Sequence, residues 1–308
     1  WFVTTFLAGL LCASLLSNDA AILLLTPVVV GSTQKLAPDR PDLPLPMAYA
    51  VFASAGVAPF PVGNPMNLFV TQYVGIDFLS YARFMVPIAL VVAAVSLASA
   101  AFWFRGALHG RVALPEHVAG TVLNRWVTAV LCATLVGYGV ASWLGGPLWA
   151  VALVGAAVAS QPAPTPKTAL LRDGIQWRTL AFLAGVVLCA VALREAGVTE
   201  VLAATYAQAS PRGIGVGAAL GSALFNNHPT AYLHMFALQE MEAPRQAYLA
   251  ALVGGDLGPR LLPSGSLAGL LWMEILGRHG IEPSLGTFVA TGIVLAVPAL
   301  LVSLLLFF

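Results

Sequence analysis

The chain has 308 residues, of which 59% are hydrophobic and 9% are charged, and its mean hydropathy is +0.88. About a quarter of the residues in a soluble domain are charged, so this composition excludes a soluble domain and predicts an all-α polytopic membrane protein. The formal net charge of +1 comes without a solvent-facing cluster of Lys and Arg, which excludes a nucleic-acid partner. Cys12, Cys132 and Cys189 lie singly in apolar runs, so we expect neither a metal site nor a cofactor.

Three polar residues interrupt the first apolar segment. Ser17, Asn18 and Asp19 lie between the apolar runs 2–16 and 20–31. A helix needs about 20 apolar residues to cross a hydrocarbon core about 30 Å thick, and neither run is that long. We therefore expect a re-entrant helical hairpin with its tip near mid-membrane. Backbone at that depth is tolerated only where it is buried in protein or lines a wet cavity, so the tip should be part of a site.

The next segment is a span with a break in its middle. A polar loop at 32–46, in which four prolines exclude a helix, leads to the span at 47–72. The break at 57–65 contains three prolines together with Gly63 and Asn64, and these prevent a continuous helical hydrogen-bond ladder. The backbone groups that are freed there make the break a candidate ligand site.

Complete spans occupy much of the remaining chain. We expect an interfacial amphipathic segment at 75–84. The predicted full spans are 86–104, 126–143, 147–160, 179–193 and 288–308. A basic loop at 105–125 and a polar loop at 161–178 separate them.

The interrupted pattern returns in the second half of the chain. A polar turn at 225–230 separates the apolar runs 214–224 and 231–238, and it contains Asn226, Asn227 and His228. A second broken span follows at 245–276. Its interruption at 255–266 contains the polar or small residues Asp256, Ser264, Gly265 and Ser266.

The two halves correspond at these interruptions. The matching residues are Asn18-Asp19 with Asn227-His228, and Gly56, Pro61 and Gly63 with Gly258, Pro263 and Gly265. Repeats with paired discontinuities are typical of secondary transporters. We therefore divide the chain into a first transport repeat at 1–105, a basic loop with scaffold spans at 106–194, and a second repeat at 195–308.

The distribution of Lys and Arg predicts the orientation. The side from which the first hairpin enters receives nine of these residues and the other side receives four, so the first side is cytoplasmic. An odd number of crossings separates the two hairpins, and the repeats are therefore inverted. This arrangement predicts a multi-pass protein of the inner (plasma) membrane, surrounded by membrane lipid.

Several motifs resemble the arsenite/antimonite efflux permeases, a family of the ion transporter superfamily. They are Ser17-Asn18-Asp19-Ala20-Ala21, Asn226-Asn227 with Pro229-Thr230, Gly255-Asp256-Leu257-Gly258-Pro259, and Pro263-Ser264-Gly265-Ser266-Leu267-Ala268. The resemblance covers nearly the whole chain and implies export of a trivalent metalloid, arsenite or antimonite, driven by protons. It also implies N-terminal scaffold helices ahead of Trp1 and, as in some arsenite pumps, an ATPase partner subunit.

One departure from the family concerns the substrate. His228 stands where the family usually carries an apolar residue before the proline. A sodium-coupled antiporter or an organic-anion/dicarboxylate symporter of the same superfamily therefore stays open as an alternative, with a small solute and a proton or sodium as coupling ion.

The candidate substrate and ion site combines the tips with the breaks. Its residues are Ser17, Asn18, Asp19, Gly63, Asn64, Asn226, Asn227, Asp256, Ser264, Gly265 and Ser266. Amide side chains both donate and accept hydrogen bonds, which suits a hydroxylated neutral solute or a sodium ion. The glycines and serines would allow close backbone approach and hydroxyl contacts.

The candidates for proton coupling are Asp19, Asp256 and His228. A charge at membrane depth costs at least about 2.5–3.5 kcal/mol, so a carboxylate there is expected to have a use. The structural alternatives are a helix cap for Asp19, an ion pair with Arg260 for Asp256, and a neutral ring that bonds a tip carbonyl for His228. Arsenous acid is mostly uncharged at neutral pH, so protons must couple through the protein. We expect Asp19, which has no basic residue within a turn, to carry the coupled proton, with both aspartates alternating between charged and protonated forms.

An enzyme is the remote alternative. Two intramembrane aspartates suggest an intramembrane aspartyl protease, in which two carboxylates share a proton. That motif is usually Gly-x-Gly-Asp, whereas Val253 occupies its first position here, and a protease leaves the duplicated hairpins unexplained. We therefore expect a transporter and not an enzyme.

Overall fold

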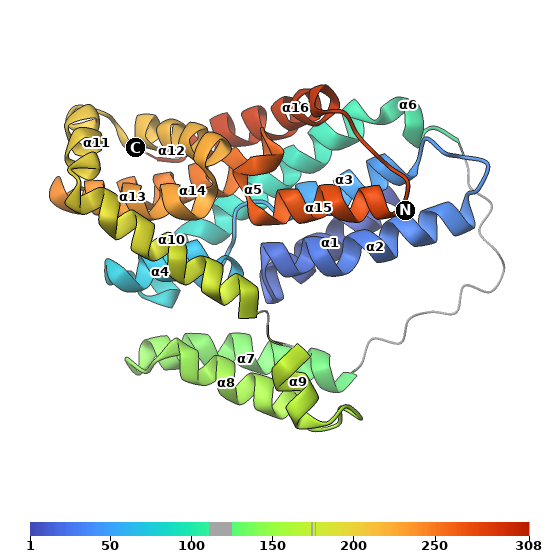
Figure 1. The fold of residues 1–308 in the computed structure, drawn as a ribbon, viewed down its shortest axis with the longest axis horizontal. Helices are drawn as coiled ribbons and strands as arrows, with labels where there is room; N and C mark the ends of the chain where they lie inside the picture. Colours follow the sequence, from blue (N-terminus) through green and yellow to red (C-terminus); the bar gives the residue numbers. More distant parts are fainter. Residues whose placement is uncertain (111–124, 174, 176, 308) are drawn as a thin grey trace.

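The computed structural model describes residues 1–110, 125–173, 175 and 177–307, and the described chain folds into helices joined by short turns (Figure 1). Three helices are long and apolar enough to cross a membrane: α5 (Phe78–Trp103), α7 (Arg125–Trp143) and α16 (Leu285–Leu304). A further candidate span combines α10 (Trp177–Glu195) with α11 (Val198–Tyr206), which are bent by 75° at the break between them. These helices agree with the polytopic membrane protein that the composition predicts.

The first two helices meet at the predicted polar turn. α1 (Phe2–Leu15) is followed by α2 (Asn18–Leu36), and Ser17 caps α2 by accepting a hydrogen bond from the Ala20 amide at 3.0 Å. The helix pair is present as predicted, and its re-entry into the membrane stays a prediction. The loop predicted at 32–46 is too long at both ends. α2 continues to Leu36, and α3 (Pro44–Ser54) begins at a proline, which the first turn of a helix accepts.

The first broken span has the predicted discontinuity. α3 ends at Ser54, a 3-10 turn, η1 (Pro61–Gly63), follows, and α4 (Pro65–Tyr73) begins after Asn64. The Asn64 side-chain oxygen caps α4 by accepting a hydrogen bond from the Met66 amide at 3.2 Å. Residues 55–64 therefore connect two helices without belonging to either α-helix.

The predicted interfacial segment at 75–84 is wrong as a separate element. α5 is one helix of 26 residues that begins directly after Asp77. The Asp77 carboxylate caps it by accepting a hydrogen bond from the Ser80 amide at 2.9 Å, and hydrogen bonding with Ser80 lowers the pKa of Asp77. Because this cap starts the helix early, the amphipathic segment continues into the span.

The middle of the chain forms a hairpin beside the rest of the molecule. After α6 (Arg105–Leu108), residues 111–124 of the predicted basic loop lie outside the described residues. α7 packs on α8 (Leu148–Ala159), below the other helices in Figure 1. α8 has 12 residues, about 18 Å of helix, so it is shorter than the full span predicted at 147–160. α9 (Lys167–Asp173) then leads to α10.

The second half repeats the order of the first. α12 (Pro211–Phe225) and α13 (Asn227–Glu240) meet at Asn226. The second broken span follows as α14 (Arg245–Leu257), the 3-10 turns η2 (Gly258–Arg260) and η3 (Pro263–Gly265), and α15 (Leu267–Arg278). The break therefore falls where the sequence predicts it.

Aromatic side chains join the two broken spans. Tyr49 and Phe52 of α3 pack against Trp272 of α15, with ring centroids 4.8 Å and 4.9 Å apart. Phe288 of α16 completes the cluster and is fully buried. This cluster fixes α3 against α15 and thereby holds the two breaks near each other.

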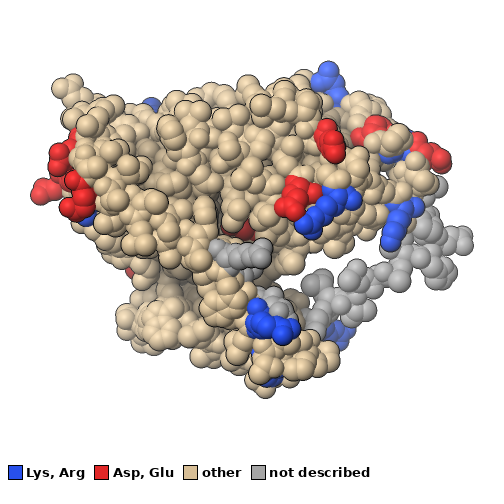
Figure 2. Space-filling model, in the orientation of Figure 1, with Lys and Arg blue, Asp and Glu red and all other residues tan. Residues whose placement is uncertain are grey.

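One face of the molecule has a broad uncharged surface. In Figure 2, many charged side chains lie toward the left and right margins and on the lower part of the molecule, and the upper middle is largely uncharged. Gln34 at the end of α2 donates to the His279 carbonyl after α15 at 2.8 Å, and Arg40 donates to the Ala107 carbonyl of α6 at 2.6 Å. These contacts bring the C-terminal ends of α2, α5 and α15 to one end of the molecule, which is the end predicted to face the cytoplasm.

Candidate functional site

A small cavity lies where the two polar turns and the two helix breaks meet. Its volume is about 30 Å³, which is enough to hold water. The polar and charged side chains that line it are Asn18, Asp19, Asn64, Asn227, Asp256, Arg260 and Ser266. All of them except Arg260 belong to the predicted site. The fold thus brings together side chains from α2, the start of α4, α13 and the second broken span.

Asp256 connects the second half of the chain to the first break. Its carboxylate accepts hydrogen bonds from the Ala58 amide at 3.1 Å, the Asn64 side-chain amide at 2.8 Å and the Asn67 side-chain amide at 3.0 Å. The Asp256 side chain is buried, and all three donors belong to residues 58–67. One carboxylate of α14 therefore fixes the shape of the first break.

Arg260 does not form the ion pair that the spacing suggested. In the described part of the chain no carboxylate lies within 4 Å of its guanidinium. Instead Arg260 donates to the Ala53 carbonyl at 2.5 Å and to the Ser96 hydroxyl at 2.8 Å. The reason is local: α14 ends at Leu257, and Gly258-Pro259 starts a 3-10 turn, so Arg260 is no longer one α-helical turn from Asp256.

The first polar turn places two side chains at the cavity, and only one of them has a hydrogen-bond partner. Asn18 donates to the Gly56 carbonyl at 2.7 Å, which ties the start of α2 to the first break. Asp19 lines the cavity, and within the described residues no donor bonds its carboxylate. Ser17 acts as the helix cap and does not line the cavity. The cap alternative for Asp19 therefore does not apply, because Ser17 fills that role.

In the second polar turn, one asparagine lines the cavity and the other shapes the turn. Asn226 adopts a positive φ of 78° and caps α13, accepting from the His228 amide at 3.3 Å. Its side-chain amide donates to the Ser264 carbonyl at 3.4 Å. Asn227 is the residue that reaches the cavity, and its side-chain oxygen has no partner among the described residues. Asn226 and Ser264 thus shape the turn.

His228 does not line the cavity. It is buried, and its ring meets Phe182 of α10 edge to face, with centroids 6.3 Å apart. Both ring nitrogens lack a hydrogen-bond partner within the described residues. The alternative in which His228 bonds a tip carbonyl is therefore not realised in this structure.

Both glycines of the predicted site, Gly63 and Gly265, lie where the chain packs closely. A Cβ on Gly265 would lie 2.7 Å from the Pro259 Cα, and one on Gly63 would lie 3.0 Å from the Ala58 Cβ. Ser266 combines two roles, since it lines the cavity and its hydroxyl accepts from the Gly269 amide at 2.9 Å as the cap of α15. Neither glycine lines the cavity itself.

Two buried residues beside Asp256 are not predicted from the sequence. Asn67 of α4 donates to Asp256 and also to the Tyr81 hydroxyl at 2.9 Å, and Tyr81 of α5 donates to the Ala58 carbonyl at 3.0 Å. Both side chains are fully buried. A signal was available for Asn67, because it is a lone amide in the apolar stretch directly after the break. Nothing local distinguishes Tyr81 from an ordinary core tyrosine.

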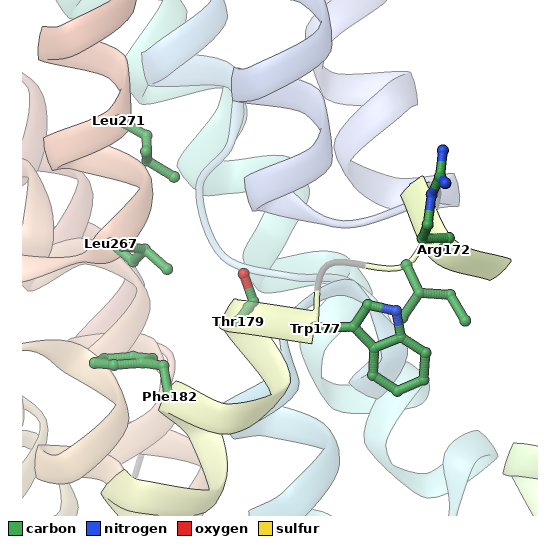
Figure 3. A pocket seen from close by; sticks show the side chains of 7 residues that line it. Arg172, Trp177, Thr179, Phe182, Leu267 and Leu271 are labelled. Atoms are coloured by element: carbon green, nitrogen blue, oxygen red, sulfur yellow. The ribbon is translucent and has the colours of Figure 1, made fainter. Parts of the chain in front are cut away.

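A larger pocket adjoins the second break. It has a volume of about 580 Å³ and lies between α9, α10 and α15. Leu267 and Leu271 point into it from α15, and Thr179 and Phe182 face them from α10 (Figure 3). Leu267 follows Ser266 directly, so this pocket begins one residue from the lining of the small cavity.

Comparison with known proteins gives a family match over the whole chain. The sequence model of the arsenical pump membrane protein family matches residues 1–308. The chain is 32% identical to the arsenical pump membrane protein of Escherichia coli (strain K12) and 30% identical to that of Yersinia enterocolitica, in both cases over 98% of this chain and 76% of the relative. It is 25% identical to the putative arsenical pump membrane protein of Bacillus subtilis (strain 168), over 94% of this chain and 75% of the relative.

Proposed function

Because this chain belongs to the arsenical pump membrane protein family, a family of membrane transporters, we propose that it exports arsenite or antimonite across the inner membrane in exchange for protons. The observation that supports this function is the convergence of both polar turns and both helix breaks on one small cavity. Membership in a transporter family argues against the protease alternative. An ATPase partner subunit stays a prediction.

The proposed architecture is a pair of inverted repeats, each with a re-entrant hairpin and a broken helix. The element order supports it: helix pair, broken span and long helix occur as α1/α2, α3/α4 and α5, and again as α12/α13, α14/α15 and α16. α5 packs on α16, so the last helices of the two repeats lie against each other. The proposed repeats are residues 1–105 and 195–308.

The proposed substrate site is the small cavity in an expanded form. Its volume of about 30 Å³ suits water, whereas a trihydroxylated metalloid has four non-hydrogen atoms. Solute entry therefore requires the polar turns to move away from the breaks. Asn18, Asn227 and Ser266 then present amide and hydroxyl groups to the solute hydroxyls. The adjoining pocket between α10 and α15 gives the solute a route of approach.

In the proposed coupling step a proton binds first to Asp19. No donor within the described residues holds the Asp19 carboxylate in its charged form, whereas three donors surround Asp256. Both carboxylates line the same small cavity, which is large enough for water, so water there can pass a proton from Asp19 to Asp256. The solute and the proton then bind at the cavity alternately, as exchange requires.

The test is arsenite uptake by everted membrane vesicles that contain the chain. We expect uptake under an imposed pH gradient with an acidic interior, and no uptake under a sodium gradient alone. Asp19→Asn keeps the size and polarity of the side chain but cannot carry a proton, so arsenite binding should persist while gradient-driven uptake is lost. Asp39→Asn is the matched control, because Asp39 is exposed in the loop before α3. Full uptake by Asp19→Asn would refute the coupling step, and uptake driven only by sodium would refute proton exchange.

A further inference from the structure

A chain of buried hydrogen bonds runs from Asp256 to the first helix break. Asn67 donates one amide hydrogen to Asp256 at 3.0 Å and the other to the Tyr81 hydroxyl at 2.9 Å. Tyr81 in turn donates its hydroxyl hydrogen to the Ala58 carbonyl at 3.0 Å. The Ala58 amide donates directly to Asp256 at 3.1 Å. Ala58 is therefore held at both its N–H and its C=O by groups that depend on Asp256.

The donor and the acceptor of each hydrogen bond in this series follow from the charge on Asp256. An ionised carboxylate only accepts hydrogen bonds, so Asn67 must present its NH₂ group to Asp256. Its second amide hydrogen then points at Tyr81, and Tyr81 must direct its own hydrogen to Ala58. This arrangement leaves the Asn67 side-chain oxygen buried without a hydrogen-bond partner among the described residues, which is destabilising.

A proton on Asp256 reverses this pattern. The carboxyl group then has a hydrogen to donate. The Asn67 oxygen, which has no partner among the described residues, accepts it when the amide rotates by half a turn and the oxygen takes the place of the NH₂ group. The rotated amide offers Tyr81 an acceptor instead of a donor. Tyr81 then donates to Asn67 and releases the Ala58 carbonyl. A buried carbonyl without a partner is destabilising, so the first break loosens.

We propose that Asn67 and Tyr81 are positioning residues that transmit the protonation of Asp256 to the first helix break. The ionised form holds the break in the shape seen here, and the protonated form releases it, so proton and solute oppose each other at the site. This inference rests on the proposed function in one respect, namely that Asp256 takes up a proton during exchange. The charged and titratable groups that face Asp256 are Asp19 of α2, Tyr81 of α5 and Arg260 of η2. Arg260 donates its hydrogen bonds to Ala53 and Ser96 and not to Asp256.

The test follows the mobility of the break and needs no transport. A nitroxide is attached to a cysteine at Val62, in a version of the chain without its three native cysteines. Val62 is half-buried and lines a pocket of about 250 Å³ beside α7, which leaves space for the label. In reconstituted membranes at successive pH values, we expect the label to be immobile at alkaline pH and to gain mobility as Asp256 becomes protonated.

Two variants separate a relay from ordinary packing, because they act in opposite directions. Tyr81→Phe removes the bond to Ala58, so the label should be mobile at every pH. Asn67→Leu disconnects Tyr81 from Asp256, and Tyr81 then stays bonded to Ala58, so the label should be immobile at every pH. Asn67→Ala, with the same expectation, replaces it where the leucine variant does not assemble. Tyr206→Phe is the control, since its hydroxyl bonds His234 far from the break, and it should keep the wild-type titration.

The outcomes separate this inference from the proposed function. A wild-type label that does not respond to pH, or variants at Asn67 and Tyr81 that both loosen the break, would overturn the relay even if arsenite transport is normal. A label that responds as expected supports the relay. The same response in a chain that moves no arsenite would refute the proposed function and leave the relay standing.

Discussion

Gly254→Ala is expected to separate the two helices that position Asp256. Gly254 lies in α14, and a Cβ there would be 2.0 Å from the Gly215 carbonyl oxygen and 2.9 Å from the Ala219 amide nitrogen of α12. Both are backbone atoms, so no side-chain rotation relieves the contact. Alanine in a helix is favoured over glycine by about 1 kcal/mol, but overpacking costs about 1–3 kcal/mol. With a contact this short the upper value applies, and we expect a net loss of about 2 kcal/mol.

The matched control is Gly185→Ala in α10. Nothing lies within 4 Å of a Cβ at Gly185, so this variant keeps the helix-propensity gain without the clash. The assay is the temperature at which the detergent-solubilised protein loses its monodisperse chromatographic peak. Gly254→Ala should lower this temperature by several degrees, and Gly185→Ala should leave it unchanged or raise it. Equal temperatures for the two variants would show that α12 and α14 do not pack through this glycine.

Three further outcomes follow from the site, the cytoplasmic end and the topology. Asn18→Ala and Asn227→Ala should each abolish arsenite uptake by vesicles while the protein stays in the membrane, and normal uptake by either would refute a site built from both turns. Arg40 hydrogen-bonds the Asp42 carboxylate and thereby lowers the pKa of Asp42 in the folded protein. The pair therefore stabilises the fold at pH values above the unfolded pKa of about 4, and this stabilisation is lost as the pH falls through the lower pKa of the folded state. The stability advantage of the wild type over Arg40→Gln should therefore be constant near neutral pH and narrow only in acid, and a narrowing near neutral pH would contradict it. A single cysteine at the exposed Ala207 should react with an impermeant thiol reagent in intact cells, because this turn is predicted to face outside; labelling only after lysis would reverse the topology.

The interruptions of the helices could be predicted from the sequence because their causes are local. A proline removes a backbone donor and a polar triplet ends an apolar run wherever the chain folds, so both turns and both breaks fall where they are expected. The extents of the helices were harder to predict. α5 starts early because Asp77 caps it, and α3 starts inside a proline-rich segment because prolines fit a first turn.

The partners of the site residues could not be predicted, because they depend on contacts between distant segments. The spacing of Asp256 and Arg260 suggested an ion pair, but a 3-10 turn between them directs Arg260 to Ala53 and Ser96. Asp256 instead binds residues 58–67, which are about 190 positions away in the sequence. Helical spacing predicts a contact only within one continuous helix, and the break that makes the site also ends that continuity.

The two halves of the chain share an architecture but differ in where they place charge. With Gly56 matched to Gly258, Ser54 of α3 occupies the position that corresponds to Asp256 of α14. Ser54 donates to the Val51 carbonyl inside its own helix, whereas Asp256 reaches across to the first break. The first break is therefore held by a titratable group from the other half, and the second break has no equivalent carboxylate from α3. Since a proton acts directly only on the group that binds it, we infer that proton uptake moves the first break ahead of the second.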